Sequence, residues 1–244
     1  MRELSTVSGA LLEPRLRTSP TAPAVTYYDD ATGERIELSA VTLANWAAKT
    51  GNLLRDELGV GPGGRVAVLL PAHWQTVGVL FGAWYVGAEV VLGHDGWAGD
   101  CDVACTTLER LDEADTAVDM GEVLVLSLDA FGRPVADLPV GVTDYATAVR
   151  VHGDQIVAER SPGPALAGRS PAEVLAAAES AGAGAGFTPG DRVLSSRAWG
   201  DPDALVGNLL SVFAAGAALV QVTNPNPAAA ERRRQAEKIT AELP

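Results

Sequence analysis

The chain has 244 residues, of which 18 are basic and 31 acidic, so that its formal net charge at pH 7 is −13. This length allows one large domain or two small ones with a hydrophobic core, and the acidic balance argues against a protein that binds nucleic acid. Two cysteines and no run of about 18 apolar residues predict a cytoplasmic protein without a membrane span or a signal peptide.

The N-terminal quarter of the chain predicts a hairpin followed by a helix. An amphipathic segment over residues 4–17 precedes a proline-rich stretch. The apolar and alternating patterns of residues 24–28 and 34–38 predict two strands joined by a turn. Ser39 is the expected N-cap of the helix that follows, and Gly59 is its expected end.

The central part of the chain predicts parallel strands joined by helices. Residues 65–71 form a continuous apolar run of strand length, a helical stretch covers residues 73–85, and a second apolar strand covers residues 89–92. This strand–helix–strand unit implies a right-handed crossover. Further strands are expected at residues 103–106, 122–128 and 155–157.

Three helix starts in the C-terminal part carry clear capping chemistry. Ser170 is followed by proline at the first helical position and by glutamate three residues later, which is a capping box. Asp201 and Asn226 each precede a proline in the same way. The alternation of strands and helices along the chain predicts an α/β fold.

A short pattern recurs within the chain. Residues 62–66 (PGGRV) return as residues 189–193 (PGDRV), and the pair at 87–88 (GA) returns at 216–217. Each copy predicts a loop, a strand, a helix and a second strand. We interpret the recurrence as two similar α/β halves with a ligand cleft between them; the alternative is that any two such units look alike.

Two segments resemble one known family. Residues 23–92, from PAVTYY to GAEVVL, resemble the start of the acyl-adenylate-forming superfamily, the AMP-dependent synthetases and ligases with an AMP-binding domain. Residues 187–220, from FTPGDRVLS to GAALV, resemble the stretch that follows this family's phosphate loop. The resemblance implies a shortened version of the family's large domain, with two sheet-centred subdomains. It places one subdomain at about residues 62–187 and the other at about residues 1–58 plus 188–244.

The sequence departs from the family where the family holds its nucleotide. Family members carry a Ser/Thr/Gly-rich phosphate loop with a lysine before the second segment, whereas no lysine occurs here between residues 50 and 237. A histidine expected near Gly200 is absent, and so are the family's adenine-binding, ribose-binding and C-terminal catalytic-lysine motifs. The resemblance therefore implies a truncated, degenerate domain without catalytic residues. We expect no cofactor, and ATP or AMP with magnesium is the alternative.

One glycine-containing loop is a candidate phosphate site. Gly163, Gly168, Arg169 and Ser170 follow the spacing of a Walker-type loop in which arginine replaces lysine. Amides at a helix N-terminus bind phosphate, and Ser170 is expected at such a terminus. Against this interpretation, Pro164 removes one amide donor, and the N-cap role alone accounts for Ser170. These four residues are the cofactor-binding candidates.

The remaining reactive side chains form no recognisable catalytic or metal site. Cys101 and Cys105 have no third cysteine or neighbouring histidine, and we expect buried thiols. His94 follows an apolar strand at an edge where α/β sheets bind ligands, and it is either a cleft residue or a loop residue. Trp97 and Trp199 lie in glycine-containing loops, and we expect them at a pocket, at an interface or partly buried beneath a loop.

These features favour a non-catalytic relic of the superfamily that acts in binding, assembly or regulation. The alternative is residual acyl-adenylate or ligase chemistry, completed by a partner chain that supplies the missing motifs. We expect residues 218–222 to form an exposed strand edge, and such edges recruit other chains. We therefore predict a homodimer that covers this edge with Trp199 and the C-terminal helix, with an unknown protein partner as the alternative.

Overall fold

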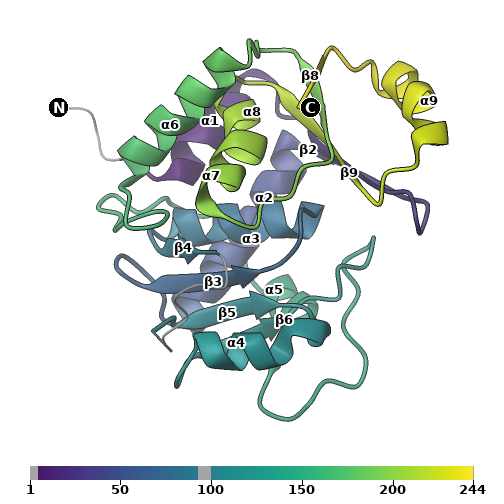
Figure 1. Ribbon diagram of the computed structural model, residues 1–244. Helices are drawn as coiled ribbons and strands as arrows, with labels where there is room; N and C mark the ends of the chain where they lie inside the picture. Colours follow the sequence, from purple (N-terminus) through teal and green to yellow (C-terminus); the bar gives the residue numbers. More distant parts are fainter. Residues whose placement is uncertain (1–4, 93–99, 244) are drawn as a thin grey trace.

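Two five-stranded sheets lie on either side of a central pair of helices (Figure 1). The computed structural model describes residues 5–92 and 100–243. Helix α2 (Ala40–Asn52) packs against helix α3 (Trp74–Tyr85), and together they contact strands of both sheets. The alternation of strands and helices confirms the predicted α/β class.

The first sheet, sheet A, contains strands from the N-terminal and the C-terminal parts of the chain. Its strands run in the order β10-β8-β9-β1-β2. Their bounds are β1 (Pro23–Asp29), β2 (Glu34–Ser39), β8 (Arg192–Ser195), β9 (Ala218–Thr223) and β10 (Ala241–Glu242). The hairpin of β1 and β2 is antiparallel, and the other pairs are parallel, with Val25 opposite Leu219.

Strand β9 lies in the middle of sheet A, so the expectation that residues 218–222 form an exposed edge is wrong. The N-terminal hairpin pairs with one side of β9, and β8 pairs with the other. Trp199, expected at the dimer contact, is only 3% exposed. The reason for expecting a homodimer at this strand therefore does not hold, and the oligomeric state itself stays a prediction.

The second sheet, sheet B, is wholly parallel and comes from the middle of the chain. Its order is β4-β3-β5-β6-β7. The bounds are β3 (Arg65–Leu69), β4 (Glu89–Val91), β5 (Val103–Thr106), β6 (Glu122–Val125) and β7 (Thr143–Asp144). The expected strand at residues 155–157 does not form, because this segment runs along α2, where Asn52 Nδ2 donates to the carbonyl of Gln155 at 3.0 Å. Leu166 instead forms a single bridge to Val90 beside β4.

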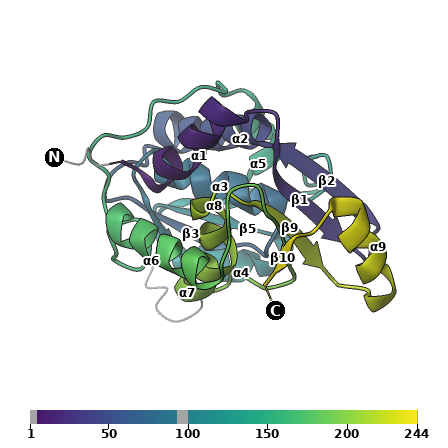
Figure 2. The ribbon, with the colours of Figure 1, turned by 90° about the horizontal axis from the view of Figure 1, so that it is seen from above.

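The helices begin where the capping chemistry predicts. Ser39, Ser170, Asp201 and Asn226 each accept a backbone hydrogen bond as N-caps, and Ser170 with Glu173 completes the capping box. The other helical bounds are α1 (Val7–Thr18), η1 (Leu53–Glu57), η2 (Leu108–Arg110), α4 (Leu111–Ala117), α5 (Tyr145–Arg150), α6 (Pro171–Gly184), α7 (Pro202–Leu205), η3 (Val206–Leu210), α8 (Ser211–Ala214) and α9 (Pro227–Glu237). Seen from above, α9 lies beside β1, β2 and β9, far from α6 (Figure 2). No helix in the described residues is long and apolar enough to cross a lipid bilayer.

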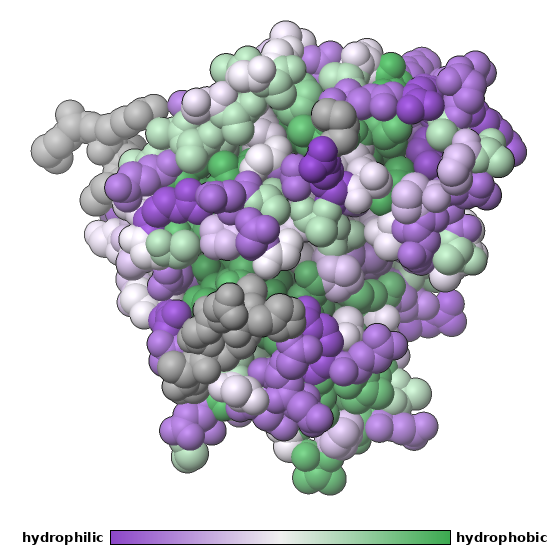
Figure 3. Space-filling model, viewed as in Figure 1, coloured by the Kyte–Doolittle hydropathy of each residue, from purple (hydrophilic) through white to green (hydrophobic). Residues whose placement is uncertain are grey.

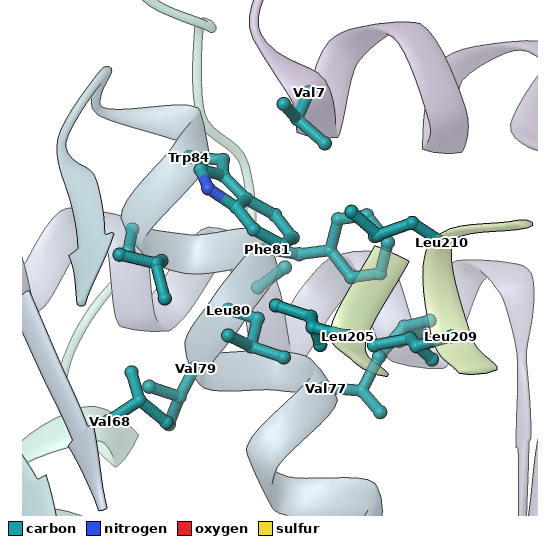
Figure 4. Close-up of a cluster of buried hydrophobic side chains, with 14 of the residues drawn as sticks. Val7, Val68, Val77, Val79, Leu80, Phe81, Trp84, Leu205, Leu209 and Leu210 are labelled. Carbon is teal, nitrogen blue, oxygen red and sulfur yellow. The ribbon is translucent and has the colours of Figure 1, made fainter. Parts of the chain in front are cut away.

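Helix α3 is the centre of the hydrophobic core. Every residue of this helix is buried. Its side chains point toward Val7 of α1 and toward Leu209 and Leu210 of η3 (Figure 4). One continuous cluster therefore includes residues of both sheets, and a smaller cluster between sheet B and α4 is separate from it.

The two segments that share the PGxRV pattern have matching local structure. Each is a strand, a helical segment and a second strand parallel to the first, namely β3–α3–β4 and β8–α7–η3–α8–β9. Gly87 and Gly216 end the helices with φ of +79° and +77°, values that favour glycine. The amide that begins each second strand donates to the loop before the first strand, Glu89 to Gly64 and Ala218 to Asp191, both at 2.8 Å.

The chain crosses between the two sheets before α6. All strands of sheet B lie within residues 65–144, and all strands of sheet A lie outside that range. Helix α6, which the expected boundary near residue 187 would place with sheet B, packs against η3 and α8 beside sheet A. The exact subdomain bounds stay a prediction.

Candidate functional site

A cleft lies where the strands of both sheets end. The loops that follow β3, β5 and β6 of sheet B meet those that follow β8 and β9 of sheet A around a cavity of about 540 Å³. We call this cavity the intersheet cleft; it is lined by residues 70–72, 107, 109–110, 128, 196–200 and 221–225. Ligands of α/β proteins bind at the carboxyl ends of parallel strands, which is the position of this cleft. Hydrophobic side chains are visible in the hollow between the two halves of the molecule (Figure 3).

The cleft carries two buried polar side chains with unsatisfied atoms. Gln221 is 1% exposed, and its Nε2 donates to the carbonyl of Arg197 at 3.0 Å. Within the described residues, neither Gln221 Oε1 nor Trp199 Nε1 has a hydrogen-bond partner. Such atoms are costly to bury without a partner, and both lie in the same wall of the cleft.

Arg197 supplies the exposed positive charge of the cleft. Its side chain is exposed, and no ion pair holds its guanidinium in the part of the chain that the structure describes. Arg110, the other arginine of the lining, is held by Glu113 through two hydrogen bonds of 3.1 and 2.7 Å. Leu70 and Leu128 give the lining an apolar part, and the exposed carboxylate of Glu109 also belongs to it. The arrangement suits a small apolar ligand that carries one anionic group.

The predicted phosphate residues lie elsewhere. The loop of Gly163, Gly168, Arg169 and Ser170 runs past the first residue of β4, at the amino end of sheet B, and none of the four lines the intersheet cleft. Gly163 donates its amide to the carbonyl of Gly87 at 3.0 Å. Gly168 donates to Glu89 Oε1 at 2.6 Å, and Ser170 donates through its amide and its hydroxyl to Glu173 at 2.8 and 2.7 Å.

Protein carboxylates thus occupy the amides that a phosphate would use. Hydrogen bonds from the hydroxyl and the amide of Ser170 lower the pKa of the Glu173 carboxyl. Arg169, the arginine in the lysine position, has Asp203 at 3.6 Å. A phosphate at this loop would have to displace two carboxylates from their donors. Phosphate binding by these four residues stays a prediction.

Neither lysine reaches the intersheet cleft. Lys49 Nζ donates to the carbonyl of His152 at 2.6 Å. Lys238 ends α9 in the left-handed conformation, with φ of +52°. The lining of the cleft therefore has arginine as its only basic residue type among the described residues.

The other reactive residues have structural roles. Cys101 and Cys105 are buried free thiols, as predicted, and burial raises the pKa of Cys105 to about 12. His73, buried against Tyr27, caps α3 by accepting the Gln75 amide at 3.2 Å, and burial lowers the pKa of this histidine. The described residues contain no group of three His, Cys, Asp or Glu side chains that could hold a metal ion. Two further candidates, His94 and Trp97, lie outside the described residues.

Sequence reasoning missed Gln221 and Arg197. The signal for Gln221 is present in the printed sequence, because it is the single polar residue inside the apolar run ALVQV of β9. Arg197 carries no such signal, since one arginine in a loop is ordinary. Trp199 was expected at a pocket, at an interface or partly buried, and the structure places it, buried, in the wall of the cleft.

Comparisons with known proteins agree with the fold. Residues 12–100 match the AMP-binding enzyme family. A TIGR03089 family protein of Mycobacterium tuberculosis (strain ATCC 25618 / H37Rv) is 61% identical over 243 residues, which cover 98% of each chain.

Solved structures of larger enzymes contain the same fold. An acyl-CoA synthetase of Brucella canis superposes with a TM-score of 0.81 at 17% identity, over 97% of this chain and 46% of that one. The acetoacetyl-CoA synthetase of Streptomyces lividans gives 0.73 at 21% identity, over 96% and 41%. A benzoate CoA ligase of Burkholderia xenovorans LB400 gives 0.72 at 16% identity, over 93% and 47%. The chain thus spans less than half the length of these three structures.

The likeness to these enzymes extends over nearly the whole chain, although at such identities it establishes the fold alone. Together with the match at residues 12–100, it confirms the resemblance seen in residues 23–92 to the N-terminal part of the acyl-adenylate-forming superfamily. The relative from M. tuberculosis matches at high identity from end to end. The chain belongs to the TIGR03089 family, whose member described here has the fold of the N-terminal part of the AMP-dependent synthetases and ligases.

Proposed function

We propose that the chain is a non-catalytic member of this superfamily that binds a small apolar carboxylate in the intersheet cleft of a cytoplasmic protein. The observation that carries the binding proposal is the exposed guanidinium of Arg197 in the lining of a partly apolar cavity, where no carboxylate of the described residues pairs with it. Arginine matches a carboxylate with two parallel donors. Regulation or assembly would then follow from occupancy of the cleft.

The absence of adenylation is proposed on electrostatic grounds. Adenylation brings a carboxylate onto the α-phosphate of ATP, so two anions must meet, and each missing stabilising group costs about 3–4 kcal/mol, or roughly 100- to 1000-fold in rate. The cleft has no lysine in its described lining, and the glycine loop at residues 163–170 has its amides on Glu89 and Glu173. Both facts disfavour a bound triphosphate.

Carboxylate binding is tested by titration calorimetry. The probes are benzoate and hexanoate, each with its carboxamide as a neutral control. We expect saturable binding of the acids, weakened about tenfold or more in Arg197→Gln and unchanged in Arg160→Gln, which removes an exposed arginine remote from the cleft. Equal affinities of the two variants, or of acids and amides, would remove Arg197 from the proposal.

Adenylation is tested by ATP–pyrophosphate exchange with a wider panel of carboxylic acids. Exchange should stay at background, and calorimetry with ATP or AMP and magnesium should show no saturable heat. Clear ATP-dependent exchange by the purified chain alone would overturn the non-catalytic interpretation.

The second candidate is residual ligase chemistry in which a partner chain supplies the missing groups. One observation favours it: three similar structures are named as CoA synthetases or a CoA ligase, and this chain covers less than half of each. Exchange activity that appears only when a second protein is added would support this candidate over the first.

A further inference from the structure

Two arginines line a second cavity, at the end of sheet A opposite the intersheet cleft. This cavity, of about 330 Å³, lies where β1, β8 and β9 begin, and Arg15 of α1 and Arg192 of β8 are both in its lining. The end of α1 with Ser19 and the turn of residues 189–191 complete it. No residue of this lining takes part in the intersheet cleft.

Arg15 is a cation without a counter-ion. Its Nη2 donates to the carbonyl of Ala217, and its guanidinium lies over the ring of Phe213, 4.9 Å from the centroid. Its Nε is buried and has no acceptor, and no carboxylate forms an ion pair with it in the described part of the chain. Burial lowers the pKa of Arg15 to about 10, so the group is still charged at neutral pH. Removing a cation from water without a partner costs free energy, which a bound anion would offset.

Arg192, the other arginine of the lining, is paired with carboxylates. Its Nη2 donates to Glu237 and, at 3.2 Å, to Thr26, and a carboxylate oxygen of Glu37 lies 3.7 Å from the same nitrogen. The charge of Arg192 is therefore already compensated, which leaves Arg15 as the arginine of the lining without a carboxylate partner in the described residues.

The one carboxylate of the lining does not neutralise the charge of Arg15. Asp191 accepts hydrogen bonds from the amide and hydroxyl of Thr188, both at 2.7 Å, and from the hydroxyl of Thr240 at 2.7 Å. Both of its oxygens are thus already engaged, and neither bonds to Arg15. Arg15 therefore has no carboxylate partner among the described residues, although Asp191 belongs to the same lining.

We propose that the cavity at the amino end of sheet A binds a small oxyanion, a phosphate or carboxylate group, with Arg15 as its principal counter-charge. Arg15, Arg192 and Ser19 all belong to the lining of this space. The size of the cavity allows the anionic group to be carried on a small organic body. The site is independent of the proposed function, because it lies at the other end of sheet A.

The test measures thermal unfolding and calorimetric heats with sodium phosphate, sodium sulfate and sodium succinate, each against sodium chloride at equal ionic strength. We expect saturable stabilisation by at least one of these anions beyond that of chloride. In Arg15→Gln the affinity should fall about tenfold or more, because a charge-assisted hydrogen bond is lost. Arg17→Gln is the matched control, since Arg17 lies on the same helix, is exposed and pairs with Glu13 at 3.4 Å.

A second variant covers the case in which Arg15→Gln does not fold. Ser19→Glu leaves the contacts of Arg15 with Ala217 and Phe213 in place and adds a carboxylate to the lining, so it should abolish the effect of the anion. Phosphate, succinate and glycerol 3-phosphate then distinguish a free phosphate from a carboxylate and from a phosphorylated metabolite. If no anion exceeds chloride, or if Ser19→Glu responds like the wild type, Arg15 is only an anchor of α1 and the proposal fails.

Discussion

At the scale of the residue, a buried carboxylate of α9, Glu237, binds several side chains of sheet A. Glu237 is 5% exposed, accepts from Tyr28 at 2.5 Å and from Arg35 at 2.9 Å, and also pairs with Arg192. Burial acts to raise the pKa of Glu237, but the hydrogen bonds from Tyr28 and Arg35 and the charge of Arg192 outweigh it, so the pKa lies below its ordinary value. One carboxylate thus holds three elements of sheet A to the C-terminal helix.

Glu237→Gln should lower the free energy of unfolding by about 2–4 kcal/mol at pH 7, because Arg35 and Arg192 lose their buried carboxylate partner and keep only the more exposed Glu37. A lowered native pKa gives stability that is present above the unfolded pKa of about 4.3 and is lost as the pH falls below it. The variant should therefore lose less stability than the wild type between pH 6 and pH 3. Urea unfolding at several pH values measures both effects. The control is Glu231→Gln on the same helix, where the side chain is 72% exposed; equal losses in the two variants would contradict the assignment.

At the scale of the element, the close crossing of α2 and α3 sets the spacing of the two sheets. Gly82 faces Thr50 so closely that an added Cβ would lie 2.5 Å from Thr50 Cβ and 3.1 Å from the carbonyl oxygen of Ala47. An added Cβ at Gly78, one turn earlier, would lie 3.4 Å from Trp46 Cβ, an ordinary contact. The crossing therefore has no room for a Cβ at Gly82, whereas it has room for one at Gly78.

Gly82→Ala should destabilise the protein by about 1–3 kcal/mol, because overpacking outweighs the better helix propensity of alanine. Gly78→Ala, in the same helix, should leave stability unchanged or raise it by up to about 1 kcal/mol. Thermal unfolding monitored by circular dichroism compares the pair. A loss of stability in Gly78→Ala as large as in Gly82→Ala would show that helix packing does not distinguish them.

At the scale of the whole molecule, one core joins both sheets. Val25 and Val193 of sheet A and Val66 and Val103 of sheet B belong to the same buried cluster. The smaller cluster beneath α4 involves the opposite face of sheet B. The two sheet-centred halves therefore share their main source of hydrophobic stability.

Unfolding should accordingly be a single cooperative transition, with coincident curves from tryptophan fluorescence and far-ultraviolet circular dichroism. Val193→Ala in sheet A and Val66→Ala in sheet B should each lower the midpoint of that one transition, because each creates a cavity in the shared core. Separate transitions, each shifted by only one of the two variants, would mean that the halves unfold independently.

Local structure was predictable because it depends on near neighbours in the chain. The N-caps Ser39, Ser170, Asp201 and Asn226 and the apolar run of β3 are local signals, and the structure confirms them. They determine the α/β class and most of the elements, and the resemblance of residues 23–92 identifies the fold. Of the candidate site, only Trp199 was singled out in advance.

Tertiary structure alone decided the strand order and the site. Strand β9 is central because the N-terminal hairpin, far away in the chain, pairs with it, and no local pattern reports such a partner. Residues 155–157 stay outside the sheet because Asn52 of α2 donates to the carbonyl of Gln155. Leu166, later in the chain, forms the bridge to β4. Gly168 keeps the spacing of a phosphate loop, but the fold brings Glu89 of β4, far away in the chain, to its amide. Composition and spacing determine which elements form, while long-range pairing determines which of their polar groups are left for a ligand.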